Sequence, residues 1–239
     1  MDCKHHDKFA RTKKKITIED NTVSAENQVT KSESVYFLGD ENASNKVLIL
    51  GNSITRHGVL EEIGWSGDWG MAASSRENDY VHQLNSELGA DYYMMVRQAS
   101  VWETRFNEEN VLEDNFSEEQ EFDADIIIFM LGENCHSLVQ DKASQTVFYN
   151  KLNEFIDYFL AEGKVFILTT CVWENALVDE TIITIANERN LPIVDLNCVG
   201  ADSSNLAVGQ FEHGGVASHP GDKGMALIAS LLYDKIMEL

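Results

Sequence analysis

Three short segments of the sequence carry side chains suited to acyl transfer. An apolar run ends in Gly51-Asn52-Ser53-Ile54-Thr55, which places a serine hydroxyl on a turn directly after a predicted strand. A later apolar run ends in Gly132-Glu133-Asn134, where the Asn134 amide could donate a hydrogen bond to an oxyanion. His219, in a glycine-flanked loop, could accept a proton near neutral pH. Taken singly, each segment also fits an ordinary turn, a helix cap or a solvated histidine.

Taken together and in this order, the three segments resemble the SGNH/GDSL hydrolase family. The resemblance covers residues 47–239 and implies a flavodoxin-like fold. It implies that Ser53 is the nucleophile and His219 the general base. The backbone N–H of Ser53 and the side chain of Asn134 would hold the oxyanion, and the family's further oxyanion N–H falls on Trp102, where the family usually has glycine. The implied mechanism needs no metal and no organic cofactor.

The sequence departs from the family pattern at the third member of the triad. The family places an acidic residue three positions before the histidine, and here that position is Val216. An acid at this place orients the imidazole and stabilises its charged form. We therefore expect either Glu212, the nearest upstream carboxylate, or a main-chain carbonyl to support His219.

Aromatic residues near the predicted active edge suggest the substrate class. Trp65, Trp69 and Trp173 could stack on sugar rings, although packing of large apolar side chains explains them equally well. Arg56 could bind an anionic group on the substrate, or it could be a solvated charge at the surface. The resemblance, together with these rings, favours a small-molecule or carbohydrate ester as substrate, especially an O-acetyl ester, on which many members of the family act.

Two other classes of function fit parts of the same sequence. Because the acid is absent at position 216, the chain could be a catalytically weakened glycan- or acyl-binding module with the same fold. A flavodoxin-like nucleotide or flavin binder is disfavoured, because no G-x-G-x-x-G or P-loop pattern follows the first strong strand. Labelling of Ser53 by a fluorophosphonate distinguishes an activated serine from a binding module.

Alternating apolar and helix-like segments must position these side chains. The apolar runs are typical of a parallel sheet that is covered on both faces. Predicted strands are 47–50, 92–96, 125–131, 165–170 and 192–196, and predicted helices are 78–88, 144–161, 174–189 and 222–237. The pattern predicts an α/β fold, a five-stranded parallel three-layer αβα sandwich whose right-handed crossovers bring every βα loop to one edge.

The chain divides into a polar N-terminal arm, residues 1–33, and one predicted hydrolase domain, residues 34–239. The acidic stretch 103–123 is poorly periodic and predicts only a short helix in a long connection. Which role the arm has, and how many subunits assemble, does not follow from these patterns.

The overall charge limits the class of partner. With 18 Lys and Arg against 40 Asp and Glu, the formal net charge is −22, which repels phosphate backbones and anionic lipid surfaces. We therefore expect no nucleic-acid partner, and the lack of a long apolar run predicts no membrane span. Cys3, Cys135, Cys171 and Cys198 lack metal-ligand spacing, so we expect no metal site and a cytoplasmic location, with free thiols as the simplest account and a disulfide as the alternative.

Overall fold

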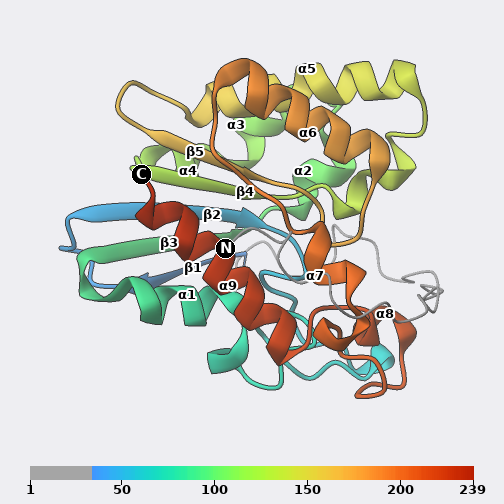
Figure 1. The fold of residues 1–239 in the computed structure, drawn as a ribbon. Helices are drawn as coiled ribbons and strands as arrows, with labels where there is room; N and C mark the ends of the chain where they lie inside the picture. The colour runs from blue at the N-terminus through green and yellow to red at the C-terminus, as the bar shows by residue number, and fades with distance from the viewer. Residues whose placement is uncertain (1–33) are drawn as a thin grey trace.

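The apolar runs of the sequence form a single mixed sheet in the computed structural model, which describes residues 34–239 (Figure 1). The predicted polar arm, residues 1–33, lies outside the described residues. Five parallel strands correspond to the predicted ones: β2 (Asn45–Gly51), β3 (Tyr92–Gln98), β4 (Ile126–Met130), β5 (Val165–Thr169) and β6 (Ile193–Val194). Their spatial order, β3-β2-β4-β5-β6, is the doubly wound order of flavodoxin-like folds.

A sixth strand corrects the predicted five-stranded parallel sheet. β1 (Val35–Gly39) pairs antiparallel with β3, so the sheet is mixed. β1 is joined to β2 by a short connection without a helix, and such an antiparallel edge strand is common on an otherwise parallel sheet. Its pairing partner lies about 60 positions away, as Val35 faces Arg97, which is why local periodicity did not reveal it.

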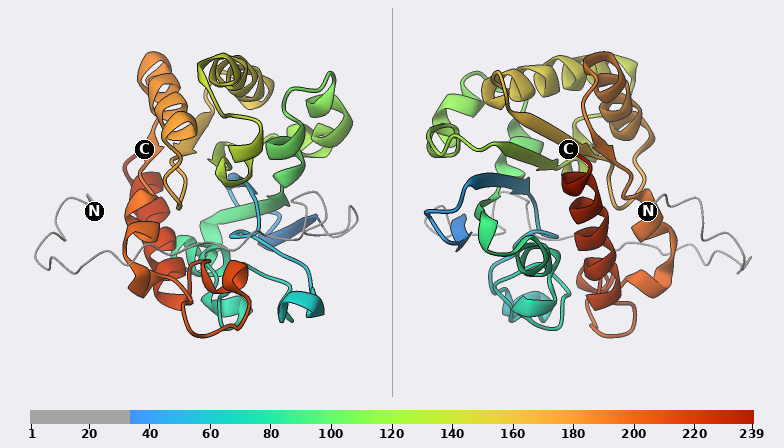
Figure 2. Two further views of the ribbon diagram at one scale, coloured as in Figure 1. Left: turned by 90° about the vertical axis from the view of Figure 1, so that its right-hand side faces the viewer. Right: turned by 60° about the vertical axis from the view of Figure 1, so that its left-hand side comes forward.

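Helices cover both faces of this sheet, which gives the predicted three layers. On one face the strands bury Leu48 and Leu50 against α2 (Ser100–Arg105), α3 (Val111–Asn115), α5 (Lys142–Phe159) and α6 (Ala176–Arg189). On the other face Val47 and Ile49 pack against α1 (Tyr80–Leu88) and α9 (Asp222–Met237). In Figures 1 and 2, the yellow and orange helices α5 and α6 lie on the side of the sheet opposite the red α9.

Side-chain caps set the starts of the long helices close to the predicted positions. Asp141 caps α5 by accepting from the Ser144 N–H at 2.8 Å, and the Ser144 hydroxyl completes a capping box. Asn175 caps α6 by accepting from the Val178 N–H at 3.4 Å. Asp79 caps α1, so that helix begins two positions later than predicted.

The acidic connection before β4 contains more helix than its poor periodicity predicted. It holds α2, α3 and α4 (Ser117–Glu121), each of five or six residues. Such short helices have little room for an amphipathic period, and their buried residues join the same core as α5 and α6. α2 matters for the site because it directly follows the carboxyl end of β3.

The loops at the carboxyl ends of the parallel strands carry the candidate site. The remaining short helices, α7 (Asn197–Ala201) and α8 (Gly214–Ala217), lie at this edge, beyond the tip of β2 (Figure 1). Within residues 34–239, no helix combines the length and the apolar character that crossing a membrane requires.

Candidate active site

Ser53 lies on the turn that follows β2, at the carboxyl edge of the sheet. The carbonyl oxygen of Asn52 closes this turn by accepting from the N–H groups of Thr55 and Arg56 at 3.0 and 2.9 Å. Position 51 requires glycine, because a Cβ there would lie 1.7 Å from the hydroxyl oxygen of Thr55. The tight turn thus holds Ser53 at the end of the strand.

The hydroxyl of Ser53 contacts the imidazole of His219. His219 lies between α8 and α9, and its Nε2 is 2.8 Å from Ser53 Oγ, although the two residues are 166 positions apart. Both side chains are almost fully buried, with Ser53 5% and His219 4% exposed. The structure therefore brings together the two groups that the sequence proposes as nucleophile and base.

A main-chain carbonyl orients the imidazole. His219 Nδ1 is 2.7 Å from the carbonyl oxygen of Gly215. Because a carbonyl oxygen can only accept, Nδ1 carries the proton and donates it. Nε2 is then the unprotonated nitrogen, and it can accept the proton of the Ser53 hydroxyl.

The position of the missing acid is part of an apolar cluster. Val216 is fully buried and packs with Ile63, Trp65, Met71, Ala72 and Ala207. Glu212, the predicted alternative support, is an exposed residue, and the Nδ1 hydrogen bond goes to Gly215 instead. Of the two expected supports for His219, the structure thus contains the backbone carbonyl.

Burial determines the charge state of the histidine. The pKa of His219 is lowered to about 4, mainly by burial and to a smaller extent by the nearby His57 and His213, while the bond to Gly215 acts in the opposite direction. A carbonyl brings no negative charge to offset burial, unlike the acid of a full triad. The imidazole is therefore a neutral base over the whole range around pH 7.

Asn134, the predicted oxyanion donor, lies just after the end of β4. Its Nδ2 donates to Glu103 Oε2 at 2.6 Å, and its backbone N–H donates to Glu103 Oε1 at 3.2 Å. An amide nitrogen carries two hydrogens, so this contact uses one of them. The second hydrogen is the one that can serve an oxyanion.

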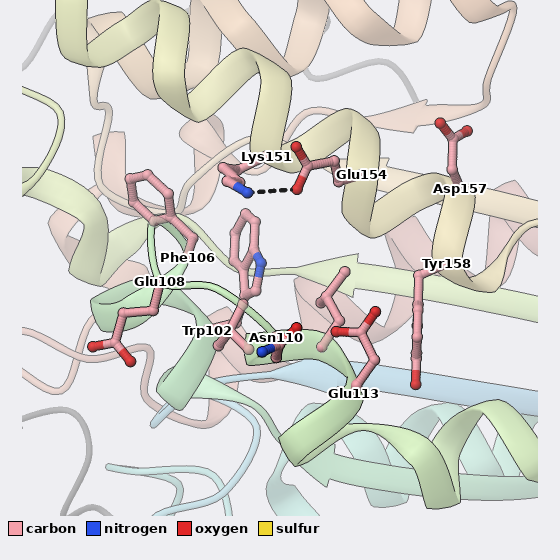
Figure 3. A pocket seen from close by; sticks show the side chains of 11 residues that line it. Trp102, Phe106, Glu108, Asn110, Glu113, Lys151, Glu154, Asp157 and Tyr158 are labelled. Carbon is pink, nitrogen blue, oxygen red and sulfur yellow. Dashed lines mark hydrogen bonds and ion pairs between the residues drawn. The ribbon is translucent and has the colours of Figure 1, made fainter.

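The structure does not support the predicted oxyanion role of Trp102. Trp102 belongs to α2, and its backbone N–H donates to the carbonyl of Ala99 at 2.9 Å. Its buried indole helps to line a cavity of about 420 Å³ between α2, α3 and α5, together with Phe106 and Tyr158 (Figure 3). Neither Ser53 nor His219 lines that cavity.

Of the three tryptophans predicted to bind substrate, only Trp173 touches the catalytic pair. Its ring meets the His219 ring edge-on at 5.0 Å, and its Nε1 donates to the Ser218 carbonyl at 3.2 Å. Trp65 and Trp69 pack on each other at 5.7 Å and donate their indole N–H groups to backbone carbonyls. Packing therefore accounts for Trp65 and Trp69.

Arg56 is engaged within the protein. Its Nε and Nη2 contact Asp68 Oδ1 at 2.9 and 2.8 Å, and its guanidinium lies over the ring of Tyr36 at 5.1 Å. The side chain is 10% exposed. These contacts describe a structural ion pair between a mostly buried Arg56 and a 40% exposed Asp68, and they do not support the predicted substrate role.

Two glutamates beside the site, the buried Glu103 and the partly buried Glu133, were not anticipated as functional residues. Glu103 and Glu133 are both hydrogen-bonded to the side-chain amide of Asn52, at 3.2 and 2.7 Å. Burial and repulsion by Glu103 raise the pKa of Glu133 to about 7. The sequence signal was present, since Glu133 lies inside the Gly132-Glu133-Asn134 segment, but only the fold shows that Glu103 reaches it.

The cysteines divide into two kinds. Cys135 and Cys171 are buried free thiols, as expected. Cys198 is disulfide-bonded, which contradicts the expectation of a free thiol there. Within residues 34–239, no group of three or more His, Cys, Asp or Glu side chains is arranged to hold a metal ion.

Comparison with known proteins identifies the fold. No protein-family model matches the sequence, and the curated proteins include no match. A G-D-S-L family protein from Desulfitobacterium hafniense DCB-2 superposes with a TM-score of 0.51 at 16% identity, covering 80% of this chain and 99% of that one. The chain therefore has the SGNH/GDSL-like hydrolase fold.

Two esterases share this fold. A two-domain esterase active on acetylated mannans gives a TM-score of 0.51 at 16% identity, covering 81% of this chain and 48% of that one. An acetyl xylan esterase from the rumen bacterium Butyrivibrio proteoclasticus gives 0.50 at 15% identity, covering 85% and 66%. At these identities the similarity extends to the fold alone.

Proposed function

We propose that this chain is a serine hydrolase that cleaves small acyl esters through an acyl-enzyme on Ser53. The observation that carries the proposal is the 2.8 Å contact between Ser53 Oγ and His219 Nε2, with Nδ1 held by the Gly215 carbonyl. A serine hydroxyl bonded to the unprotonated nitrogen of an oriented imidazole is the arrangement that activates a nucleophile.

The reaction follows from these groups. Ser53 Oγ attacks the ester carbonyl carbon while its proton moves to His219 Nε2. The tetrahedral oxyanion accepts from the Asn134 amide and from the Ser53 N–H. The alcohol then leaves with the proton from the imidazolium, and an ester to Ser53 remains. Water, deprotonated by the same nitrogen, releases the acid and restores the serine.

We further propose that the substrate is an O-acetyl ester on a carbohydrate. The Trp173 ring lies beside His219 and is partly exposed, so a sugar ring could stack near the reacting atoms. Both esterases described above act on acetylated polysaccharides according to their names, and they share the fold of this chain. The alternative of a binding module without turnover predicts an unreactive Ser53.

The test compares Ser53→Ala with the wild-type protein on an aryl acetate and on acetylated sugars. We expect turnover of the wild type and at least a thousandfold loss of kcat in the variant, because the nucleophile is absent. Ser86→Ala, which changes an exposed serine of α1, serves as the matched control and should retain wild-type turnover. A fluorophosphonate should label the wild type and not Ser53→Ala. Equal turnover in Ser53→Ala, or an unlabelled wild type without activity, would contradict the proposal.

A further inference from the structure

Glu103 is a completely buried carboxylate next to the candidate site. It lies on α2, one turn after β3, with no exposed surface. Burying a carboxylate is costly unless hydrogen bonds or a cation compensate for the lost water. Among the described residues no lysine, arginine or histidine forms an ion pair with it, so hydrogen bonds must compensate.

Four N–H groups from two other loops donate to this carboxylate. Oε1 accepts from the backbone N–H of Gly132 at 2.6 Å, that of Asn134 at 3.2 Å, and the Asn52 amide at 3.2 Å. Oε2 accepts from the Asn134 side-chain amide at 2.6 Å. An ionised carboxylate is an acceptor only, and it suits four donors without a conflict.

The contact to Oε2 decides the orientation of the Asn134 amide. An asparagine side chain can rotate by 180°, which exchanges its donor and acceptor ends. A carboxylate oxygen at 2.6 Å accepts from the NH₂ end and would repel the carbonyl end. The orientation in which the second N–H is available to an oxyanion is thereby selected before substrate arrives.

We propose that Glu103 is a positioning residue for ester hydrolysis, which holds the Asn134 amide in its oxyanion-donating orientation. The proposal rests on the function proposed above. Glu103 itself does not touch the reacting atoms, and it acts through Asn134.

A second, partly buried glutamate keeps Glu103 in place. Glu133 accepts from the same Asn52 amide at 2.7 Å and from the Val172 backbone N–H at 3.0 Å. The network thus joins the loops after β2, β4 and β5, and Asn52 is the residue next to Ser53. A shared amide donor between two carboxylates restricts the movement of all three groups.

A double-mutant cycle tests the proposal. kcat and KM for an aryl acetate are measured for the wild type, Glu103→Gln, Asn134→Ala and the double variant. In Glu103→Gln one carboxylate oxygen becomes an NH₂ group that faces N–H donors, so Asn134 loses its fixed orientation. Loss of one oxyanion donor typically lowers kcat by roughly 10²–10³-fold, and we expect Asn134→Ala to fall in this range.

The loss of kcat caused by Glu103→Gln should depend strongly on whether Asn134 is present. Glu103→Gln should lower kcat by about 50-fold or more with KM within about threefold, because the lost contact matters in the transition state. In the Asn134→Ala background the same change should cost no more than about threefold. A kcat of Glu103→Gln within threefold of the wild type, or losses that multiply in the double variant, would overturn the proposal.

Glu119→Gln is the matched control. Glu119 is also a buried glutamate, 2% exposed, but it lies on α4 and pairs with Arg97 at 3.1 Å. We expect it to retain wild-type kcat, and an equal loss in both variants would show a merely structural effect.

A second variant covers the case in which Glu103→Gln does not fold. Glu103→Asp keeps the charge but withdraws the oxygens by one methylene, out of reach of the Asn134 side chain. It should fold and lose kcat by at least tenfold, and a wild-type kcat would contradict the proposal. A wild type that hydrolyses no ester would instead contradict the proposed function, so the two failures differ.

Discussion

At the scale of single residues, the site depends on a histidine supported by a neutral group. Gly215 accepts from His219 Nδ1 through its carbonyl, which selects the tautomer but adds no negative charge. The imidazolium that forms during attack is therefore less stabilised than in a triad with an acid. The same lack of charge lets burial lower the pKa of the histidine to about 4.

This low pKa predicts activity at acidic pH. A base acts in its unprotonated form, which dominates above its pKa, so kcat/KM should stay high as pH falls through 6.5, the ordinary value for histidine, and decline only near pH 4. The measurement is kcat/KM for an aryl acetate between pH 3.5 and 8 at constant ionic strength, with circular dichroism to verify folding. An acid limb centred near 6.5 would show that burial does not lower the pKa of the catalytic imidazole.

The carbonyl support also predicts the effect of removing the nearest acid. Glu212 is exposed, so Glu212→Ala should change kcat by less than about twofold, as expected of a surface substitution away from the site. Steady-state kinetics on the same ester measures it, beside Glu61→Ala as a second exposed glutamate. A loss beyond tenfold confined to Glu212→Ala would mean that this carboxylate reaches the imidazole.

At the scale of elements, the ends of β2, β4 and β5 are tied together by buried polar groups. Glu133 begins the 3-10 turn after β4, and it contacts Asn52 after β2 and Val172 after β5. The preceding residue, Gly132, has a φ of +145° that favours glycine, and a Cβ there would lie 2.8 Å from Cys171 Sγ. The loops are therefore held by specific contacts that resist substitution.

Glu133 predicts a pH dependence of stability. Folding raises its pKa from 4.5 to about 7, so between these values the folded state holds a proton that the unfolded state has released. Its contribution to stability is full below pH 4.5 and is lost as pH rises to 7. Glu133→Gln imitates the protonated form at every pH, and it should become more stable relative to the wild type as pH rises.

Urea unfolding of both proteins at pH 5, 6, 7 and 8 measures this difference. We expect the free energy of unfolding of the variant, relative to the wild type, to increase by on the order of 2 kcal/mol from pH 5 to pH 8. Because His219 is present in both proteins, its opposite contribution at acidic pH cancels in the comparison. A constant difference across this pH range would contradict the assigned ionisation.

At the scale of the whole molecule, a third apolar cluster links the two catalytic segments. It lies apart from the two cores that cover the faces of the sheet. Trp65, from the segment after Ser53, packs with Val216 and Ala207, which lie three and twelve positions before His219 in the chain. This cluster fixes the distance between segments that no strand pairing connects.

Trp65→Ala should therefore affect both stability and activity. Truncating a buried tryptophan costs about 3–5 kcal/mol, and here the loosened segments should also lower kcat at temperatures where the protein is folded. Phe166→Ala is the control. Phe166 is a fully buried residue of β5 in the core between the sheet and helices α5 and α6. It should lose similar stability in urea unfolding yet keep its kcat. Equal kcat values for the two variants would argue against the linking role.

The sequence by itself determined the parallel strands, the long helices and the three segments with Ser53, Asn134 and His219. These features are local, because apolar period, caps and turn residues act between near neighbours. It did not reveal β1, whose only strand partner is distant in the chain, or the short helix that engages the Trp102 N–H.

Only the tertiary structure decided which groups meet. The 2.8 Å contact between Ser53 and His219, the Gly215 carbonyl in place of an acid, and the shared donors of Glu103 and Glu133 all join residues from different loops. Burial also depends on the complete fold, and it is burial that lowers the pKa of His219 and raises that of Glu133. The sequence specifies the types of the side chains, whereas the distances between them and their exposure to water are set when the layers pack.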